Sequence, residues 1–200
     1  MIDAVTSLTK EVEDIILLRG MLKVACSFNK STQVLMDDGS RKGIGKIKPG
    51  EKVQAADPVT GKHAGARTVA ASLVHHDDDL TDVAIRTKGG RMATVHTTSR
   101  HPFWDATTHT WVPPGRLVPG HRLNTATGKN SFVVAVRVTP GSADMYNLTV
   151  GQLHTYYVLA GQTPVLVHNS TCPEVDEISR NISNHALESA KRPMETAPTS

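Results

Sequence analysis

Two short segments near opposite ends of the sequence carry side chains that can attack a peptide bond of their own chain. Cys26 directly follows Ala25, so its sulfur can reach the preceding carbonyl through a five-membered ring and convert that amide into a thioester, an N-to-S acyl shift. Asn169 lies between His168 and Ser170, and its side-chain amide can attack its own backbone carbonyl, which would form a succinimide and free the Ser170 amine. Both reactions would rearrange or cut the chain itself.

The acyl shift at Cys26 needs assistance, because amide resonance makes the thioester product unfavourable in water. A Thr-x-x-His pattern, formed by Thr98 and His101, offers suitable groups. We expect His101 to be the general acid on the nitrogen of the Ala25–Cys26 bond. The Thr98 hydroxyl, or backbone N–H groups near it, would hold the carbonyl oxyanion.

Cyclisation of Asn169 is slow in a free peptide, so a fixed conformer must supply most of its rate. His168 stands immediately before it and can polarise the carbonyl that is attacked, while His154 could activate the amide nitrogen. A single histidine is more often an ordinary surface or core residue, and this holds for His154 taken alone. Adjacency to Asn169 makes His168 the better supported of the two.

The segment between these residues has the pattern of a β-rich domain. From Thr32 to Val167 the sequence is a succession of short β-branched runs, among them ARTVAASLV, SFVVAVRV and TYYVL. Turn signals such as Asp38-Gly39 and Pro49-Gly50 separate the runs. This pattern predicts a compact all-β domain, in which we interpret Trp104 and Trp111 as packing residues.

The pattern changes on both sides of this domain. Residues 4–19 have apolar positions at helical spacing and predict a short amphipathic helix, and the segment after Asn169 again has helical spacing. We therefore divide the chain into an N-terminal flank (1–25), the all-β domain (26–169) and the start of a downstream module (170–200).

Composition and spacing exclude several partners and cofactors. A net charge of +3 without a Lys/Arg cluster gives no nucleic-acid surface, and the N-terminal stretch is too polar for a signal peptide or a membrane span. The two cysteines form no disulfide framework, and no Cys/His pair has zinc-ligand spacing. His75-His76-Asp77-Asp78-Asp79 cannot converge on one ion, and we interpret it as a solvated loop. No metal and no other cofactor is expected.

Four segments, taken in order, are similar to the motifs of the Hint family, which comprises inteins, hedgehog-type autoprocessing domains and bacterial toxin-associated processing domains. They are residues 25–61, which open with ACSFNK, residues 97–104, TTSRHPFW, residues 145–158, MYNLTVGQLHTYYV, and residues 165–170, VLVHNS. The resemblance implies a horseshoe-like all-β fold with close termini. Since both reacting bonds must share one site, we expect the first and last strands to lie side by side.

The same resemblance implies single-turnover, autocatalytic processing of the chain's own flanking segments by a monomeric domain. Splicing inteins commonly carry Asp in the third motif, where this chain has Asn147. Asn147 cannot titrate, which argues against coordinated acyl transfer to Ser170. The third motif is more similar to processing domains that precede effector modules of bacterial polymorphic toxins, whose parent proteins are secreted. We therefore expect cleavage at Asn169–Ser170 to release a downstream module, with splicing of residues 1–25 onto 170–200 as the alternative.

Two interpretations from other classes stay open. A cysteine hydrolase acting on other proteins through Cys26 and His101 predicts turnover of added substrate and indifference to Asn169→Ala. An inert β scaffold predicts an unchanged mass on incubation. Hedgehog-like ester transfer is disfavoured, because those domains do not need a His–Asn pair at the C-terminal end. Cys172 could intercept a thioester, although Ser170 at the junction is the expected acceptor.

Overall fold

The structure, a computed structural model, describes residues 26–87, 89–128 and 131–169. These residues form one antiparallel sheet of fourteen strands and two short 3-10 turns. In chain order the elements are β1 (Phe28–Asn29), β2 (Gln33–Leu35), β3 (Arg41–Gly43), η1 (Ile44–Lys46), β4 (Lys52–Ala56), β5 (His63–Asp77), β6 (Leu80–Arg86), β7 (Met92–Thr98), β8 (Phe103–Asp105), β9 (Thr110–Val112), η2 (Pro114–Arg116), β10 (Arg122–Leu123), β11 (Ser131–Val138), β12 (Ala143–Val150), β13 (Thr155–Ala160) and β14 (Thr163–His168).

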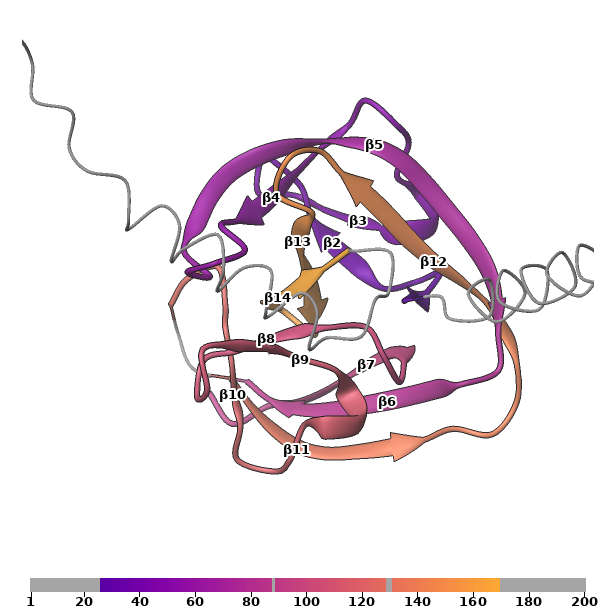
Figure 1. Cartoon of the computed structure of the whole chain (residues 1–200), viewed down its shortest axis with the longest axis vertical. Coiled ribbons are helices and arrows are strands. Elements are labelled where there is room, and N and C mark those ends of the chain that lie inside the picture. Colours follow the sequence, from indigo (N-terminus) through magenta and orange to yellow (C-terminus); the bar gives the residue numbers. More distant parts are fainter. Residues whose placement is uncertain (1–25, 88, 129–130, 170–200) are drawn as a thin grey trace, which may run out of the picture.

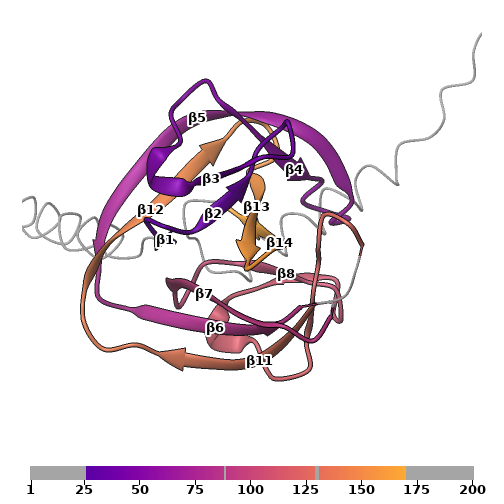
Figure 2. The same ribbon diagram turned by 180° about the vertical axis from the view of Figure 1, so that it is seen from behind.

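The sheet bends back on itself into a horseshoe. Thirteen of its strands follow the order β3-β2-β13-β14-β8-β10-β11-β6-β7-β1-β12-β5-β4, and the fourteenth, β9, pairs with β8. A bridge between Met36 and Val53 brings the two ends of this path together. Long, curved β5 and β12 form one side and β6 and β11 the other, with β13 and β14 between them (Figure 1, and from behind Figure 2). The predicted horseshoe-like all-β fold is confirmed.

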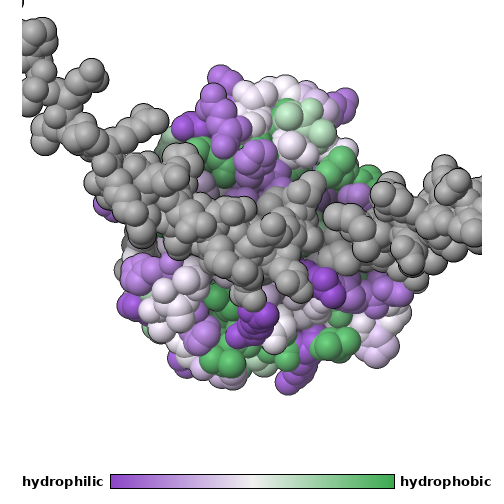
Figure 3. Space-filling model, viewed as in Figure 1, coloured by the Kyte–Doolittle hydropathy of each residue, from purple (hydrophilic) through white to green (hydrophobic). Residues whose placement is uncertain are grey.

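Alternation of side chains along the strands builds the core. In β6, Thr81, Val83 and Ile85 are buried while the residues between them are half-buried, as expected for a strand with one face on a core. The main core is largely aliphatic, and Phe28, Phe103 and Tyr156 are its aromatic members. On the coloured parts of the outer face, hydrophilic and hydrophobic side chains are interspersed (Figure 3). The core therefore lies within the bend of the sheet.

The first and last strands, which we expected to lie side by side, are not neighbours in the sheet. β14 forms a hairpin with β13 and its other edge pairs with β8, while β1 pairs with β12 and β7. A strand has only two edges, and those of β14 are both occupied. The two ends of the domain must therefore meet by another route, which runs through β12.

The predicted helix at residues 4–19 and the downstream segment 170–200 lie outside the described residues. The helical turns of the described part of the chain span three residues each, and none could cross a membrane.

Candidate active site

The Thr-x-x-His segment closes over the residue that follows Cys26. Thr98, the last residue of β7, is fully buried, and its Oγ1 accepts a hydrogen bond from the Ser27 N–H at 3.1 Å. The Ser27 carbonyl in turn accepts bonds from the Thr98 N–H at 3.1 Å and from the Thr97 hydroxyl at 2.8 Å. Two adjacent threonines thus clamp both backbone groups of Ser27. The clamp fixes the peptide on the C-terminal side of the proposed nucleophile.

Cys26 is 4% exposed, and its sulfur lies 3.4 Å from the carbonyl oxygen of Arg100, inside the same turn. The sulfur is part of a disulfide. The other cysteine of the sequence, Cys172, lies outside the described residues, as does Ala25 on the far side of the scissile bond. Because only a thiolate can attack a carbonyl, acyl transfer to Cys26 requires this sulfur in its reduced form.

His101 is completely buried next to Cys26, with its ring centroid 4.1 Å from that of Phe28. Burial lowers its pKa from 6.5 to about 3; the Cys26 backbone opposes this shift, and the charge of His168 adds to it. His101 is therefore a neutral imidazole at physiological pH, able to donate one N–H and to accept one proton.

Asn169 is held by its backbone and by its side chain. Its N–H donates to the His154 carbonyl at 2.7 Å, and its Nδ2 donates to the Leu148 carbonyl of β12. The side-chain oxygen is buried and has no partner within the described residues. The nitrogen that would attack is thus oriented by a backbone carbonyl. Ser170, the residue it would release, lies outside the described residues.

His168 ends β14 and is 7% exposed. Its ring lies edge-on to Trp111, with centroids 4.9 Å apart, and stacks on His154 at 6.5 Å. Burial, and then the charge of His154, lowers its pKa to about 4. His154 itself is exposed and has a positive φ of 52°, a backbone conformation that is costly for a residue with a side chain. A neutral imidazole therefore precedes Asn169 in the chain. The strained residue His154 contacts both residues, because its ring stacks on His168 and its carbonyl accepts the Asn169 N–H.

The two reacting ends converge on β12. Phe28 is opposite Tyr146 in the β1–β12 register, so the chain running back from Phe28 to Cys26 leads toward Leu148. The Leu148 carbonyl holds the Asn169 side chain. Protonation of His168 would lower the pKa of His101 further, because two positive charges in this buried region repel each other. The structure thus brings the candidates of the first, second and fourth motifs into one buried neighbourhood.

Asn147, which with His154 is a candidate of the third motif, bonds to a residue that the sequence did not single out. Its Oδ1 accepts from the Leu148 N–H at 2.7 Å and from the Tyr156 hydroxyl at 2.9 Å. Tyr156 is fully buried, with its ring centroid 6.4 Å from that of His101. In the sequence its aromatic neighbour Tyr157 looks equivalent. Only the faces on which the two side chains lie distinguish them.

The packing interpretation of Trp104 and Trp111 is confirmed, but Trp111 also touches the site. The two indoles are 3% exposed and meet edge to face at 5.0 Å. The Trp111 indole N–H donates to the Pro58 carbonyl at 2.9 Å, which fixes the ring that contacts His168. The loop 57–61 is thereby an anchor for Trp111.

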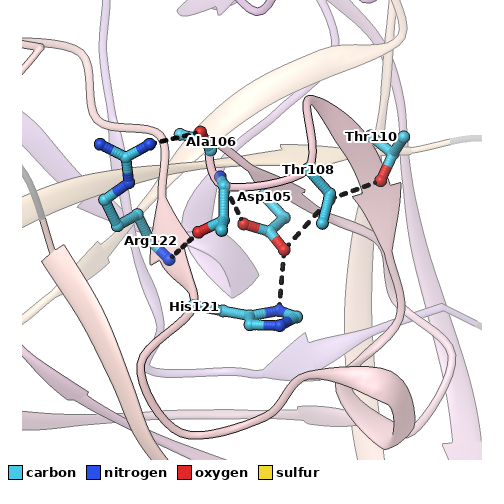
Figure 4. A network of polar contacts seen from close by, with 7 residues as sticks. Asp105, Ala106, Thr108, Thr110, His121 and Arg122 are labelled. Atoms are coloured by element: carbon cyan, nitrogen blue, oxygen red, sulfur yellow. Dashed lines mark hydrogen bonds and ion pairs between the residues drawn. The ribbon is translucent and has the colours of Figure 1, made fainter.

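A polar network holds the β8–β9 hairpin that carries both indoles (Figure 4). The fully buried Asp105 carboxylate accepts from the Thr107 N–H at 2.7 Å and from the Thr108 hydroxyl at 3.2 Å, and it pairs with His121 at 2.7 Å. The Arg122 guanidinium closes the network on the Ala106 carbonyl at 3.1 Å. His121 therefore supports this hairpin through its contact with Asp105.

The acidic segment is not wholly a solvated loop. His75 and His76 are exposed, but they belong to β5, whose last residue, Asp77, is 6% exposed. Burial raises the Asp77 pKa, and the Ser27 side chain, beside the carboxyl, opposes this shift. Antiparallel pairing of Asp77 with Ala143 extends the strand through the segment, and that is why the loop interpretation fails there.

Comparison with known proteins matches the chain to the pretoxin Hint domain over residues 34–170, a stretch that includes the second, third and fourth motifs but begins after Cys26. The solution structure of a bacterial intein-like domain from Clostridium thermocellum is 30% identical, with a TM-score of 0.61, over 73% of this chain and 99% of that one. No curated protein matches the chain.

Two inteins share the fold at lower identity. The DnaB intein from Synechocystis sp. PCC 6803 is 19% identical, with a TM-score of 0.58, over 73% of this chain and 99% of that one. The gp41-1 intein is 18% identical, with a TM-score of 0.54, over 73% of this chain and 100% of that one. The chain therefore belongs to the pretoxin Hint family, and it is an intein-like autoprocessing domain of the Hint superfamily.

Proposed function

We propose that this domain cuts its own C-terminal junction, Asn169–Ser170, by asparagine cyclisation, and that it activates the Ala25–Cys26 bond by an N-to-S acyl shift. The observation that carries the proposal is the buried Asn169 side chain, whose nitrogen is oriented by the Leu148 carbonyl. The preceding residue in the chain, His168, is neutral because burial lowers its pKa to about 4. Asparagine has the one common side chain that can close a five-membered imide on its own carbonyl.

In the cyclisation, Nδ2 attacks the backbone carbonyl carbon of Asn169, and the bond to the Ser170 nitrogen breaks. One proton leaves Nδ2 and one proton must reach the departing amine. Neutral His168 can accept the first and pass it on, because an imidazole carries one basic nitrogen and one N–H. Burial excludes bulk water from the step, and the fixed conformer supplies the effective molarity that a free peptide lacks.

At the other end, the reduced Cys26 sulfur attacks the Ala25 carbonyl carbon. The carbon–nitrogen bond breaks, and the thiol proton ends on the Cys26 amine. His101 can carry that proton, because its neutral ring has one basic nitrogen to accept it, and its low pKa makes the protonated ring a strong donor to the departing amine. The Thr98 clamp on Ser27 holds the following peptide still while the bond before it is twisted.

In this proposal residues 26–169 are the processing unit, the monomeric chain is its own single-turnover substrate, and residues 170–200 begin the released effector module. Intact-mass measurement of wild type, Cys26→Ala and Asn169→Ala tests it. We expect loss of a fragment of 31 residues (200 − 169). Asn169→Ala should abolish that loss and Cys26→Ala should spare it.

Other outcomes would identify the alternatives. Splicing would give a product of 56 residues (25 + 31) that is missing from both variants. A mass that stays unchanged in wild type would refute self-cleavage. Turnover of an added protein by Asn169→Ala would show a cysteine hydrolase.

A further inference from the structure

The orientation of the Asn147 side-chain amide is fixed by its neighbours. A backbone N–H can only donate, so the atom that faces the Leu148 N–H at 2.7 Å must be Oδ1 and not Nδ2. The Tyr156 hydroxyl donates to the same oxygen at 2.9 Å. Two donors therefore converge on one acceptor. Rotation of the amide would break both bonds within a buried site.

Leu148 connects this amide to the reacting residue. Its N–H is bonded to Asn147 and its carbonyl accepts from Asn169 Nδ2, so one residue joins the two side chains. The Leu148 side chain is fully buried in the main core, and in β12 the residue is paired with Ser72 of β5. A displacement of the Leu148 peptide would move the acceptor that orients the attacking nitrogen.

We propose that Tyr156 is a positioning residue for asparagine cyclisation: by holding Asn147 it fixes the Leu148 carbonyl that orients Asn169. The inference rests on the proposed self-cleavage and adds a residue to its site. Tyr156 does not touch the reacting atoms and acts through two hydrogen bonds and one peptide group. A small misplacement of a reacting group is expensive, because cyclisation depends on near-attack geometry.

Tyr156 is suited to serve as a constant donor. Its burial raises the pKa of the phenol well above 10, and the Leu148 backbone beside the hydroxyl opposes this shift only in part, so the hydroxyl keeps its proton at neutral pH. Removal of the hydroxyl would leave the buried Asn147 oxygen with one donor instead of two. Removal of the hydroxyl should therefore lower the rate of cyclisation, and the factor by which the rate falls should not depend on pH.

The chain provides a matched control in the next residue. Tyr157 lies on the same strand and is also buried, but it packs in the second hydrophobic cluster with Trp104 and Trp111. Its hydroxyl has no hydrogen-bond partner in the described part of the chain. Tyr157→Phe therefore removes the same atom from the same strand without breaking a bond.

The test compares release of the 31-residue fragment from full-length wild type, Tyr156→Phe, Tyr157→Phe, Asn147→Ala and the Asn147→Ala/Tyr156→Phe double variant. We expect Tyr156→Phe to be slower by about tenfold, the scale of one buried hydrogen bond, and Tyr157→Phe to match wild type within about twofold. In the Asn147→Ala background, Tyr156→Phe should have a smaller effect than in wild type, because the two residues act on the same Leu148 peptide group. Asn147→Asp, which keeps an acceptor for both donors, should cleave faster than Asn147→Ala.

Three results would overturn the inference while leaving the self-cleavage proposal standing. The first is release of the fragment from Tyr156→Phe at the wild-type rate, and the second is a double variant in which the rate effects of the two single variants multiply. The third is that Tyr156→Phe slows fragment release and hydroxylamine cleavage at the Ala25–Cys26 bond by the same factor. Chemistry at the Ala25–Cys26 bond, measured as hydroxylamine cleavage of reduced protein, should be unchanged in Tyr156→Phe and reports that the site is folded. If wild type itself releases no fragment, the proposed function fails, and this inference fails with it.

Discussion

The side-chain amide of Asn169 donates its hydrogen bond to the backbone carbonyl of Leu148, 21 positions earlier in the chain. Leu148 belongs to β12, and β12 pairs with β1, the strand that begins two residues after Cys26. The middle of one strand thus connects the two ends of the domain, although β1 and β14 do not pair. The start of β1 and the residue that follows β14 are therefore both connected to β12.

Acid should destabilise the domain through its buried histidines. The pKa values of His101 and His168 are about 3 and about 4 in the folded chain, against 6.5 for an exposed histidine. The unfolded state therefore binds more protons between pH 6.5 and these values. The neutral rings make their full contribution to the free energy of unfolding above about pH 6.5. As pH falls below that value, this contribution decreases by at most about 1.4 kcal/mol per pH unit for each ring.

Urea unfolding at pH 7, 5 and 4 of non-cleaving Asn169→Ala protein, with and without His101→Gln, measures this effect. His101→Gln should make the fall in unfolding free energy shallower. His109→Gln changes an exposed side chain and should leave the slope as it was. Identical slopes for all three proteins would contradict the burial argument.

Chemistry at the N-terminal junction should depend on reduction, and chemistry at the C-terminal junction should not. A sulfur held in a disulfide cannot attack the Ala25 carbonyl, whereas cyclisation of Asn169 uses no thiol. Hydroxylamine cleaves thioesters and spares disulfides, so it should release residues 1–25 only when a phosphine reductant is present.

Cys172→Ala is the control, because the chain has no other cysteine with which Cys26 could form an intramolecular disulfide. That variant should release residues 1–25 without the phosphine. Hydroxylamine cleavage of untreated wild type at the same rate as the reduced protein would show that the sulfur is already available.

Trp111 should matter to C-terminal cleavage more than its neighbour Trp104 does. Trp111→Phe loses the bond to the Pro58 carbonyl and part of the surface that covers His168, so we expect cleavage to slow by about tenfold, the cost of about 1.4 kcal/mol in positioning. Trp104→Phe removes the same volume from the same cluster without a ring contact to His168. Rates of fragment release that fall equally in both variants would assign the effect to packing alone.

Gly61 should tolerate no larger side chain. Its φ is +67°, and a Cβ would lie 2.6 Å from the Trp104 indole nitrogen and 2.7 Å from the Asn124 amide nitrogen. Gly61→Ala should lower the unfolding free energy by about 2 kcal/mol or more, the combined cost of strain and overpacking. Gly39→Ala has a similar φ of +81° but open space around the Cβ, so the difference between the two thermal midpoints isolates the clash.

Most of the fold could be predicted from local patterns. The run SFVVAVRV coincides with β11, and TYYVL and PVLV lie in the β13–β14 hairpin, whose residues are mostly buried on both faces. Short runs of β-branched and aromatic residues indicate a strand locally, whether one face or both faces are buried. The end of β5 was wrongly interpreted, since five polar residues in a row gave no sign that Asp77 would be paired and buried. Local composition does not reveal which polar residues a distant strand will cover.

The sequence alone determined which side chains can react. Cys26 and Asn169 each adjoin the peptide bond they would break, and five-membered ring closure depends only on residue type and position in the chain. The tertiary structure decided the rest: that the two ends meet across β12, that His101 and His168 are neutral, and that Tyr156 rather than Tyr157 bonds to Asn147. Burial and strand-edge pairing depend on residues far apart in sequence, and they have no local signature.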